Sequence, residues 1–206
     1  MWVLVQDGTI VKTFEFAKGF THNNNQYSKD IFTKWSSSEK EAIGLYEVVI
    51  DNTNLKDSKY YNNGNPSITF SNNVATKSWP DATAKDLNDV LVTQEDIDNG
   101  LVIDKEVGDV KIEGLKTIHK RTIKEQASNL LAKNDWQVIK ATEVTDYSVP
   151  SAVTAYRANV RTRSNEMETA IDNAADVDAL EALYTYTEQA DGTSTRPLGE
   201  WPEEVI

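Results

Sequence analysis

The feature that most constrains the fold is the spacing of apolar residues in the C-terminal part of the chain. From Ser151 onward they recur at intervals of 3, 4, 7 and 4 residues, at Val153, Tyr156, Val160, Met167 and Ile171. One face of an α-helix repeats at this spacing. The pattern therefore predicts an amphipathic helix that reaches about Asp172, with Pro150 at its start, where proline is tolerated.

The segments on either side of this helix carry similar signals. Leu115 to Lys133 places its apolar residues on roughly one face of a second helix, and a break follows at Asn134. The Asp176 side chain suits the N-cap of a third helix, which begins at Val177. The residues from Gly192 onward include two prolines and two glycines, so we predict an extended tail.

The N-terminal part has the signals of β-structure instead. Asp7-Gly8 lies between the runs Trp2–Gln6 and Thr9–Phe16, and it favours a hairpin because a type I′ turn needs positive φ at both central residues. A second hairpin is predicted around Asn72-Asn73. Leu45 to Ile50 is apolar and β-branched, which predicts a central strand.

Shorter signals cover the rest of the N-terminal part. Gly19 to Asp30 is polar and predicts a surface loop. Ser38 and Glu41 have capping-box spacing, which predicts a brief helix. Residues 86–92 favour a short helix, and residues 104–114 have the composition of a linker.

These patterns together predict an α+β fold. The chain has 206 residues, enough for one large domain or two small ones. Because the composition changes within the predicted linker, we expect a β-rich N-terminal domain over residues 1–110. Residues 111–206 are then expected to form a small helical domain with an extended tail.

Composition narrows the classes of function. The chain has no cysteine, which excludes disulfides, thiolate metal sites and cysteine nucleophiles. Its formal net charge of -12 repels phosphate backbones, so we expect no nucleic-acid partner. No stretch approaches the ~18 apolar residues of a membrane span, and the N-terminus lacks the regions of a signal peptide. We therefore expect synthesis in the cytoplasm and no membrane partner.

Signatures of enzyme chemistry are missing from the sequence. The two histidines, His22 and His119, have no companion ligands at metal-binding spacing, so solvated or capping roles are expected. No phosphate-binding glycine loop and no nucleophile elbow occurs. Asp96 to Gly100 fails the register of a calcium loop, and the basic run around Lys120 predicts a solvated helix face. We accordingly predict no catalytic residue, no cofactor and no bound metal.

Large aromatic residues in otherwise polar segments are the best candidates for partner contacts, because they need a surface to cover them. Tyr60 and Tyr61 lie in the polar stretch from Asp51 to Pro66. Trp201 and Pro202 lie in the acidic tail. We predict that these four residues contact another chain.

The C-terminal half carries a run of unusual residues in a fixed order, between about Arg121 and Pro202. The run consists of Leu130, Leu131, Asp135, Trp136, Pro150, Tyr156, Arg157 and Arg161, with Trp201-Pro202 near the end. It resembles the C-terminal module of phage tail-fibre assembly proteins and tail assembly chaperones. Lys140 departs from that module, which usually has arginine there.

The N-terminal part resembles uncharacterised proteins encoded beside the tail genes of marine bacteriophages. The resembling stretches are the Asp7-Gly8 hairpin, Ile31-Phe32 with Trp35, Ala42–Val48 and Tyr60–Asn63. The two resemblances imply a non-enzymatic structural protein of the phage tail or tail fibre, located in the virion. The alternative is a tail-fibre assembly chaperone that is not retained in the particle. Either would have other tail or fibre proteins as partners, and it could form a homo-oligomer.

The same residues also have a purely structural interpretation. Asp135 could cap the turn after it, and Trp136 could fill the junction between two helices. A buried Trp136 would cost about 3–5 kcal/mol on truncation to alanine. Arg157 and Arg161 would border the apolar stripe and reach acids with their guanidinium groups. We favour this interpretation of the run as a marker of a fold over direct contact with a partner.

Overall fold

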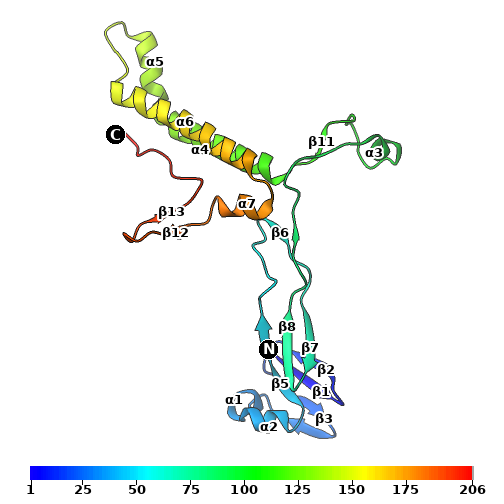
Figure 1. Cartoon of the computed structure of the whole chain (residues 1–206). Helices are drawn as coiled ribbons and strands as arrows, with labels where there is room; N and C mark the ends of the chain where they lie inside the picture. Colours follow the sequence, from blue (N-terminus) through cyan, green and yellow to red (C-terminus); the bar gives the residue numbers. More distant parts are fainter. Residues whose placement is uncertain (206) are drawn as a thin grey trace. The chain divides into compact units, whose positions relative to one another are not determined.

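The computed structural model describes residues 1–205 and divides them into two compact units, which meet at residues 83 and 84. Strands dominate the first unit and helices the second, so the predicted α+β class is confirmed (Figure 1). The division lies well before residue 110, because the segment after residue 84 belongs with the helices. The Leu115 amide donates to Asp86 O at 2.9 Å, and the Gly114 amide donates to Asp89 Oδ1 at 2.7 Å.

The first unit is built on a five-stranded sheet with the order β2-β1-β5-β8-β7. Its strands are β1 (Trp2–Gln6), β2 (Thr9–Phe14), β5 (Leu45–Asp51), β7 (Ser67–Ser71) and β8 (Val74–Ser78). The middle strand, β5, pairs antiparallel with β1 and parallel with β8. The predicted central strand and both predicted hairpins are therefore confirmed.

The two hairpin turns have the backbone that their residues favour. Asp7 and Gly8 have φ of 50° and 77°, and Asn72 and Asn73 have φ of 51° and 61°. Positive φ at both central residues matches the twist of the paired strands, and Asn, Asp and Gly adopt it most readily. The local sequence thus sets the register of β1 with β2 and of β7 with β8.

A third hairpin lies where a surface loop was predicted. Strand β3 (Phe20–His22) pairs with β4 (Asn25–Tyr27) across Asn23 and Asn24, both with positive φ. The Phe20 ring is buried and lies 4.8 Å from the Phe14 ring, measured between centroids. The loop prediction was wrong because it weighed the polarity of the turn and not the aromatic residues that bracket it.

Two short helices follow, α1 (Ile31–Lys34) and α2 (Ser37–Glu41). The capping box of α2 is formed by Ser36 and Glu39, so the predicted box of Ser38 and Glu41 is wrong by two residues. The chain turns to extended backbone at Trp35, directly after α1, which makes Ser36 the first residue able to cap the next helix.

Side chains of the first unit pack on both faces of the sheet. Within β1, Leu4 faces one cluster, while Val3 and Val5 face the other, as the alternation of a strand requires. The first cluster consists of Leu4, Phe14, Phe20, Ile31, Phe32 and Leu45. The second consists of Val3, Val5, Val48 and Ala75. A short pair of strands, β6 (Tyr61–Asn62) and β9 (Thr83–Ala84), completes this part of the chain.

The second unit begins with β10 (Val90–Leu91), α3 (Gln94–Asp98) and β11 (Val110–Ile112). The helix predicted over residues 86–92 is absent, and residues 104–114 are not a linker, because β11 pairs with β10. The helix α3 starts two residues beyond the end of the predicted one, after a capping box of Thr93 and Asp96. The buried Asp96 carboxylate also accepts a bond from Lys111 on β11.

Four helices form the body of the second unit: α4 (Leu115–Ala132), α5 (Asp135–Glu143), α6 (Ser151–Asn173) and α7 (Val177–Ala182). Helices α4 and α6 lie side by side (Figure 1). All five residues of the predicted apolar stripe on α6 are buried, which confirms that helix. Asp176 Oδ1 accepts from the Ala179 amide at 2.8 Å, so the predicted cap of α7 is confirmed as well.

The chain after α7 is mostly extended, as predicted. It forms one short hairpin, β12 (Thr187–Glu188) with β13 (Ser194–Thr195), and then returns to α4 and α6. We call residues 185–196 the arm and residues 198–205 the strap.

Candidate partner-binding surface

A buried guanidinium joins three of the helices of the second unit. Arg157 on α6 donates from Nη1 to Leu131 O at 2.6 Å, at the end of α4. It donates from Nη2 to Asp135 Oδ1 at 2.7 Å, in the first turn of α5. Asp135 therefore does not cap the helix as predicted; it is the acid that the Arg157 guanidinium reaches.

Other residues of the motif pack around this junction. Tyr156 is buried together with Ala127 and Val160, and Leu130 and Leu131 pack against that cluster. Pro150 occupies the N-cap of α6, and Arg161 Nη1 donates to Arg157 O at 3.3 Å. Most of the run thus has a structural role, which agrees with its interpretation as the marker of a fold.

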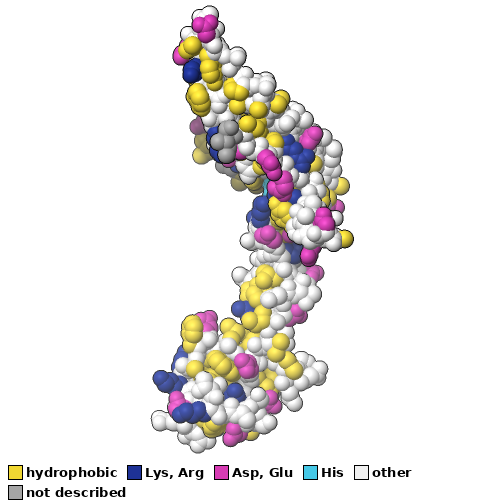
Figure 2. All heavy atoms as spheres, turned by 90° about the vertical axis from the view of Figure 1, so that its left-hand side faces the viewer, with side chains coloured by type: hydrophobic (Ala, Val, Ile, Leu, Met, Phe, Trp, Pro, Cys, Tyr) yellow, Lys and Arg dark blue, Asp and Glu magenta, His cyan; other side chains and the backbone are white. Residues whose placement is uncertain are grey.

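Trp136 does not fill the helix junction, contrary to the prediction. Its side chain is 57% exposed, and Ile139, one turn further along α5, is 54% exposed. Val138 and Val144 are exposed as well. We call these four residues the α5 apolar surface, and Figure 2 shows hydrophobic side chains open to solvent at the end of the unit where α5 lies.

The exposure of Trp136 follows from which side of α5 faces the protein. The partly buried positions of α5 are Gln137 and Ala141, four residues apart and so on one face. Trp136 and Ile139 are turned away from that face by the 3.6-residue period. The hydrophobic effect disfavours the exposure of two large apolar side chains one turn apart on a helix, which makes them a candidate site of interaction.

Trp201 and Pro202 make their contacts within the chain. The Trp201 ring packs on the cluster of Ala127, Tyr156 and Val160, and its Nε1 donates to Gln126 Oε1 at 3.0 Å. Pro202 is half-buried beside α6. The prediction that these two residues contact another chain is therefore not supported by their position, because α4 and α6 supply the surface that covers them.

Tyr60 and Tyr61 are also covered. Their side chains are 3% and 4% exposed. Lys56 Nζ lies 4.3 Å from the centroid of the Tyr61 ring, and Lys59 Nζ lies 5.1 Å from that of Tyr60. Both tyrosines are buried, so neither is an exposed contact residue as predicted.

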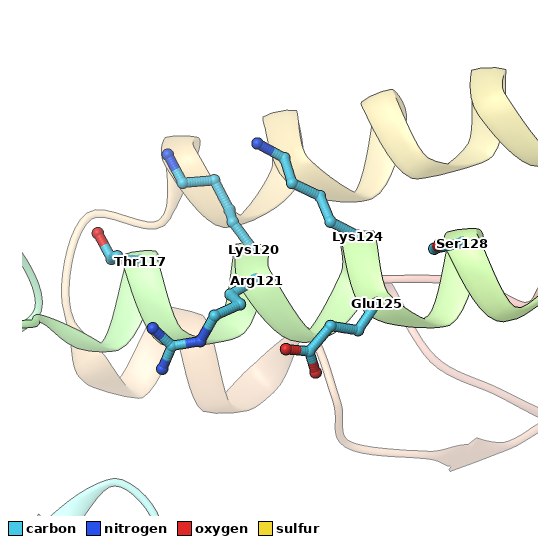
Figure 3. A pocket seen from close by; sticks show the side chains of 6 residues that line it. All are labelled: Thr117, Lys120, Arg121, Lys124, Glu125 and Ser128. Atoms are coloured by element: carbon cyan, nitrogen blue, oxygen red, sulfur yellow. The ribbon is translucent and has the colours of Figure 1, made fainter.

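A hollow of about 510 Å³ runs along α4, lined by Thr117, Lys120, Arg121, Lys124, Glu125 and Ser128 (Figure 3). Lys120 and Lys124 point toward α6, where they pair with Asp172 at 2.7 Å and with Glu168 at 3.3 Å. Arg121 points the other way and pairs with Glu113 at 2.6 Å. Each cation is neutralised by an acid, so the hollow has no net attraction for an anionic ligand.

His119 and the acidic side chains are the remaining candidates for metal binding. His119 is buried, and its ring lies 4.8 Å from the Tyr184 ring, so the expected solvated role is wrong. Among residues 1–205, no group of three or more His, Cys, Asp or Glu side chains is arranged to hold a metal ion. No helix in the same range is long and apolar enough to span a membrane.

The α5 apolar surface is therefore the most distinctive candidate site in the second unit. The sequence predicted Trp136 at the junction between two helices, whereas the residue lies exposed on α5, and the sequence did not single out Val138 or Val144. No protein-family model, no curated protein and no solved structure matches the chain.

Proposed function

We propose that this protein is a non-enzymatic structural protein of a bacteriophage tail or tail fibre, which acts by presenting the α5 apolar surface to another tail protein. The observation that carries the proposal is the exposure of Trp136 and Ile139 on a helix whose first turn is tied to α6 by the contact of Asp135 with Arg157. Tryptophan is the residue that most often anchors a protein interface. The resemblance of the surrounding motif to tail-fibre assembly proteins supports the choice of partner.

The position of α5 supports a role in recognition. The Arg157 guanidinium ties Asp135 to α6 and to the end of α4, so the helix is fixed at the end where Trp136 lies. A fixed surface loses little conformational entropy when it binds, and less of the binding free energy is spent on ordering it.

The alternative is a chaperone that binds the same tail protein through the same surface and leaves before the particle is complete. The two roles differ in how long the contact lasts. A virion component needs a larger, mostly apolar interface, whereas a chaperone binds more weakly. The first unit, with its own sheet and core, is additional structure that favours the virion component.

Mass spectrometry of purified phage particles separates the two roles. A structural protein is recovered in the particles in a fixed ratio to the other tail proteins. Absence from the particles, with presence in the lysate of infected cells, would leave the chaperone as the proposal.

Replacement of Trp136 and Ile139 together by alanine tests the surface itself. We expect the variant to fold and to lose incorporation into particles. Ile103→Ala is the matched control, because Ile103 is 83% exposed in the same unit but lies outside the α5 apolar surface. Normal incorporation of the double variant would contradict the proposal.

A further inference from the structure

The strap binds α4 and α6 as an extended peptide would. Trp201 and Val205 pack on the apolar cluster of Ala127, Tyr156 and Val160, which belong to the two helices. The Trp201 indole donates to the side chain of Gln126. This is the composition of a binding site for a short peptide: an apolar patch for one aromatic anchor and a polar partner for its N–H.

Two cations hold the strap from the helix side. Arg163 on α6 donates from Nη2 to Leu198 O at 2.9 Å and from Nε to Glu200 O at 3.0 Å. Lys133, just after α4, pairs with Glu204 at 2.6 Å. The helices therefore recognise two backbone carbonyls and one carboxylate, and none of these contacts depends on the strap belonging to the same chain.

The arm that leads to the strap has little hold on the rest of the unit. Nearly all residues from 185 to 196 are exposed, and β12 and β13 pair with each other. At its base, Tyr186 and Arg196 donate to Glu200 in exposed bonds, and Arg196 Nε donates to Gly199 O at 3.2 Å in a partly buried one. Segments with few buried contacts open locally at low free energy, so the arm is suited to swing away with the strap.

One contact in the strap site is imperfect. The Tyr156 hydroxyl is buried in the cluster that the strap covers, and it has no hydrogen-bond partner within residues 1–205. An unpaired buried hydroxyl costs free energy, and this cost is the same whether the strap comes from the same chain or from a second copy.

We propose that the surface of α4 and α6 also accepts the strap of a second copy, so that copies of this chain join by exchanging straps. The formal net charge of -12 opposes close face-to-face contact between two copies. A narrow arm avoids that repulsion, and its Glu204 meets Lys133 of the receiving chain. The proposal is independent of what the α5 apolar surface binds.

Mass action sets the conditions for exchange. A strap tethered by a short flexible arm acts on its own helices at an effective concentration of order 1 mM. Exchange therefore appears when the chain itself approaches that concentration, as it does within an ordered assembly, and it disappears on dilution.

Cross-linking tests the proposal, because the chain has no cysteine of its own. Lys133→Cys and Glu204→Cys are introduced in separate chains, mixed at about 1 mM or about 1 µM, and treated with a short bismaleimide. We expect a covalent heterodimer at the higher concentration and at least about tenfold less at the lower one.

Two controls make the result decisive. A chain with both substitutions should cross-link within itself, which shows that the strap still reaches its site. Lys120→Cys mixed with Asp172→Cys, from an ion pair of α4 and α6 away from the strap, should give no heterodimer. An equal yield from the two mixtures, or no heterodimer at about 1 mM while the double variant cross-links internally, overturns the proposal.

Sedimentation of the unmodified chain provides a second readout that needs no cysteine. At about 1 mM the dimer fraction should be substantial, and at about 1 µM it should be at least about tenfold smaller. A chain that stays monomeric at both concentrations also contradicts strap exchange.

Discussion

Arg157 and Asp135 form an ion pair between α6 and α5, with 2.7 Å between Nη2 and Oδ1. The guanidinium is buried, whereas the carboxylate is half-exposed. The same guanidinium also donates to Leu131 O at the end of α4, which accepts from the Asn134 amide as well.

Replacement of Arg157 by alanine should release α5. We expect the free energy of unfolding of the helical unit to fall by about 2–3 kcal/mol, since two charge-assisted bonds from a buried group are lost. Amide hydrogen exchange over residues 135–143 measures the release directly. Arg161→Ala is the matched control, and it should change stability by less than about 1 kcal/mol. Unchanged protection of α5 in Arg157→Ala would show that the helix is held by something else.

Replacement of Trp136 by alanine should have little effect on stability. A buried tryptophan would cost about 3–5 kcal/mol, but an exposed one should cost less than about 1 kcal/mol. Denaturant unfolding followed by circular dichroism gives the value. Leu180→Ala, at a fully buried residue of the same unit, should cost about 2–5 kcal/mol and shows that the assay detects a core substitution.

Replacement of Gly199 by alanine should displace the strap. Gly199 has φ of 75°, and an added Cβ would lie 1.3 Å from Arg163 Nη2. Either the guanidinium or the strap must move, and the hydrogen bonds from Arg163 to Leu198 O and Glu200 O are then weakened. Limited proteolysis after residue 199 should become at least several-fold faster. In Gly192→Ala, φ is also positive but nothing lies within 4 Å, so only the backbone strain of about 1 kcal/mol applies and the strap should stay protected.

A fall in pH should weaken the ion pair of Asp96 with Lys111, which attaches α3 to β11. The hydrogen bond from Lys111, together with that from the Thr93 amide, lowers the pKa of Asp96 from its ordinary value of 3.8 to about 2. The folded state therefore holds the proton less tightly than the unfolded chain does. The contribution is complete above the unfolded pKa, and it is lost as the pH falls from about 4 through about 2.

Hydrogen exchange of α3 between pH 5 and pH 2 checks this dependence. Asp96→Asn should remove it, because the amide does not titrate in this range. Asp98→Asn leaves the contact with Lys111 intact and should retain the acid dependence of the unmodified chain. If hydrogen exchange of α3 in Asp96→Asn keeps the pH dependence of the unmodified chain, Asp96 is not the group that titrates.

The elements that could be predicted from sequence are those whose signal is local. Asp7-Gly8 and Asn72-Asn73 determine their turns through the φ angles that they adopt, and the spacing along α6 identifies its buried face. The capping role of Asp176 is equally local, because the residue bonds to an amide three positions on. Asn23-Asn24 carried the same turn signal, and Phe20 and Tyr27 beside it mark the strands that were overlooked.

The candidate site could be predicted only in part, because exposure depends on what covers a residue. Trp136, Tyr60 and Trp201 are all large aromatic residues next to polar ones, and the sequence predicted the wrong exposure for each side chain. Tyr60 is buried and Trp201 is covered by distant helices, whereas Trp136 is left open. Which of these occurs is decided by tertiary contacts between residues far apart in the chain.

The first unit cannot complete its sheet until β5 meets β8, and in this ladder Val48 pairs with Ala75. The β1–β2 and β7–β8 hairpins close through two-residue turns, but the parallel ladder must wait for the whole intervening segment. During synthesis on the ribosome, the second apolar face of β1 therefore stays open to water until β8 has emerged. We expect the nascent chain to acquire its first protease-resistant unit only after residue 78 has left the exit tunnel.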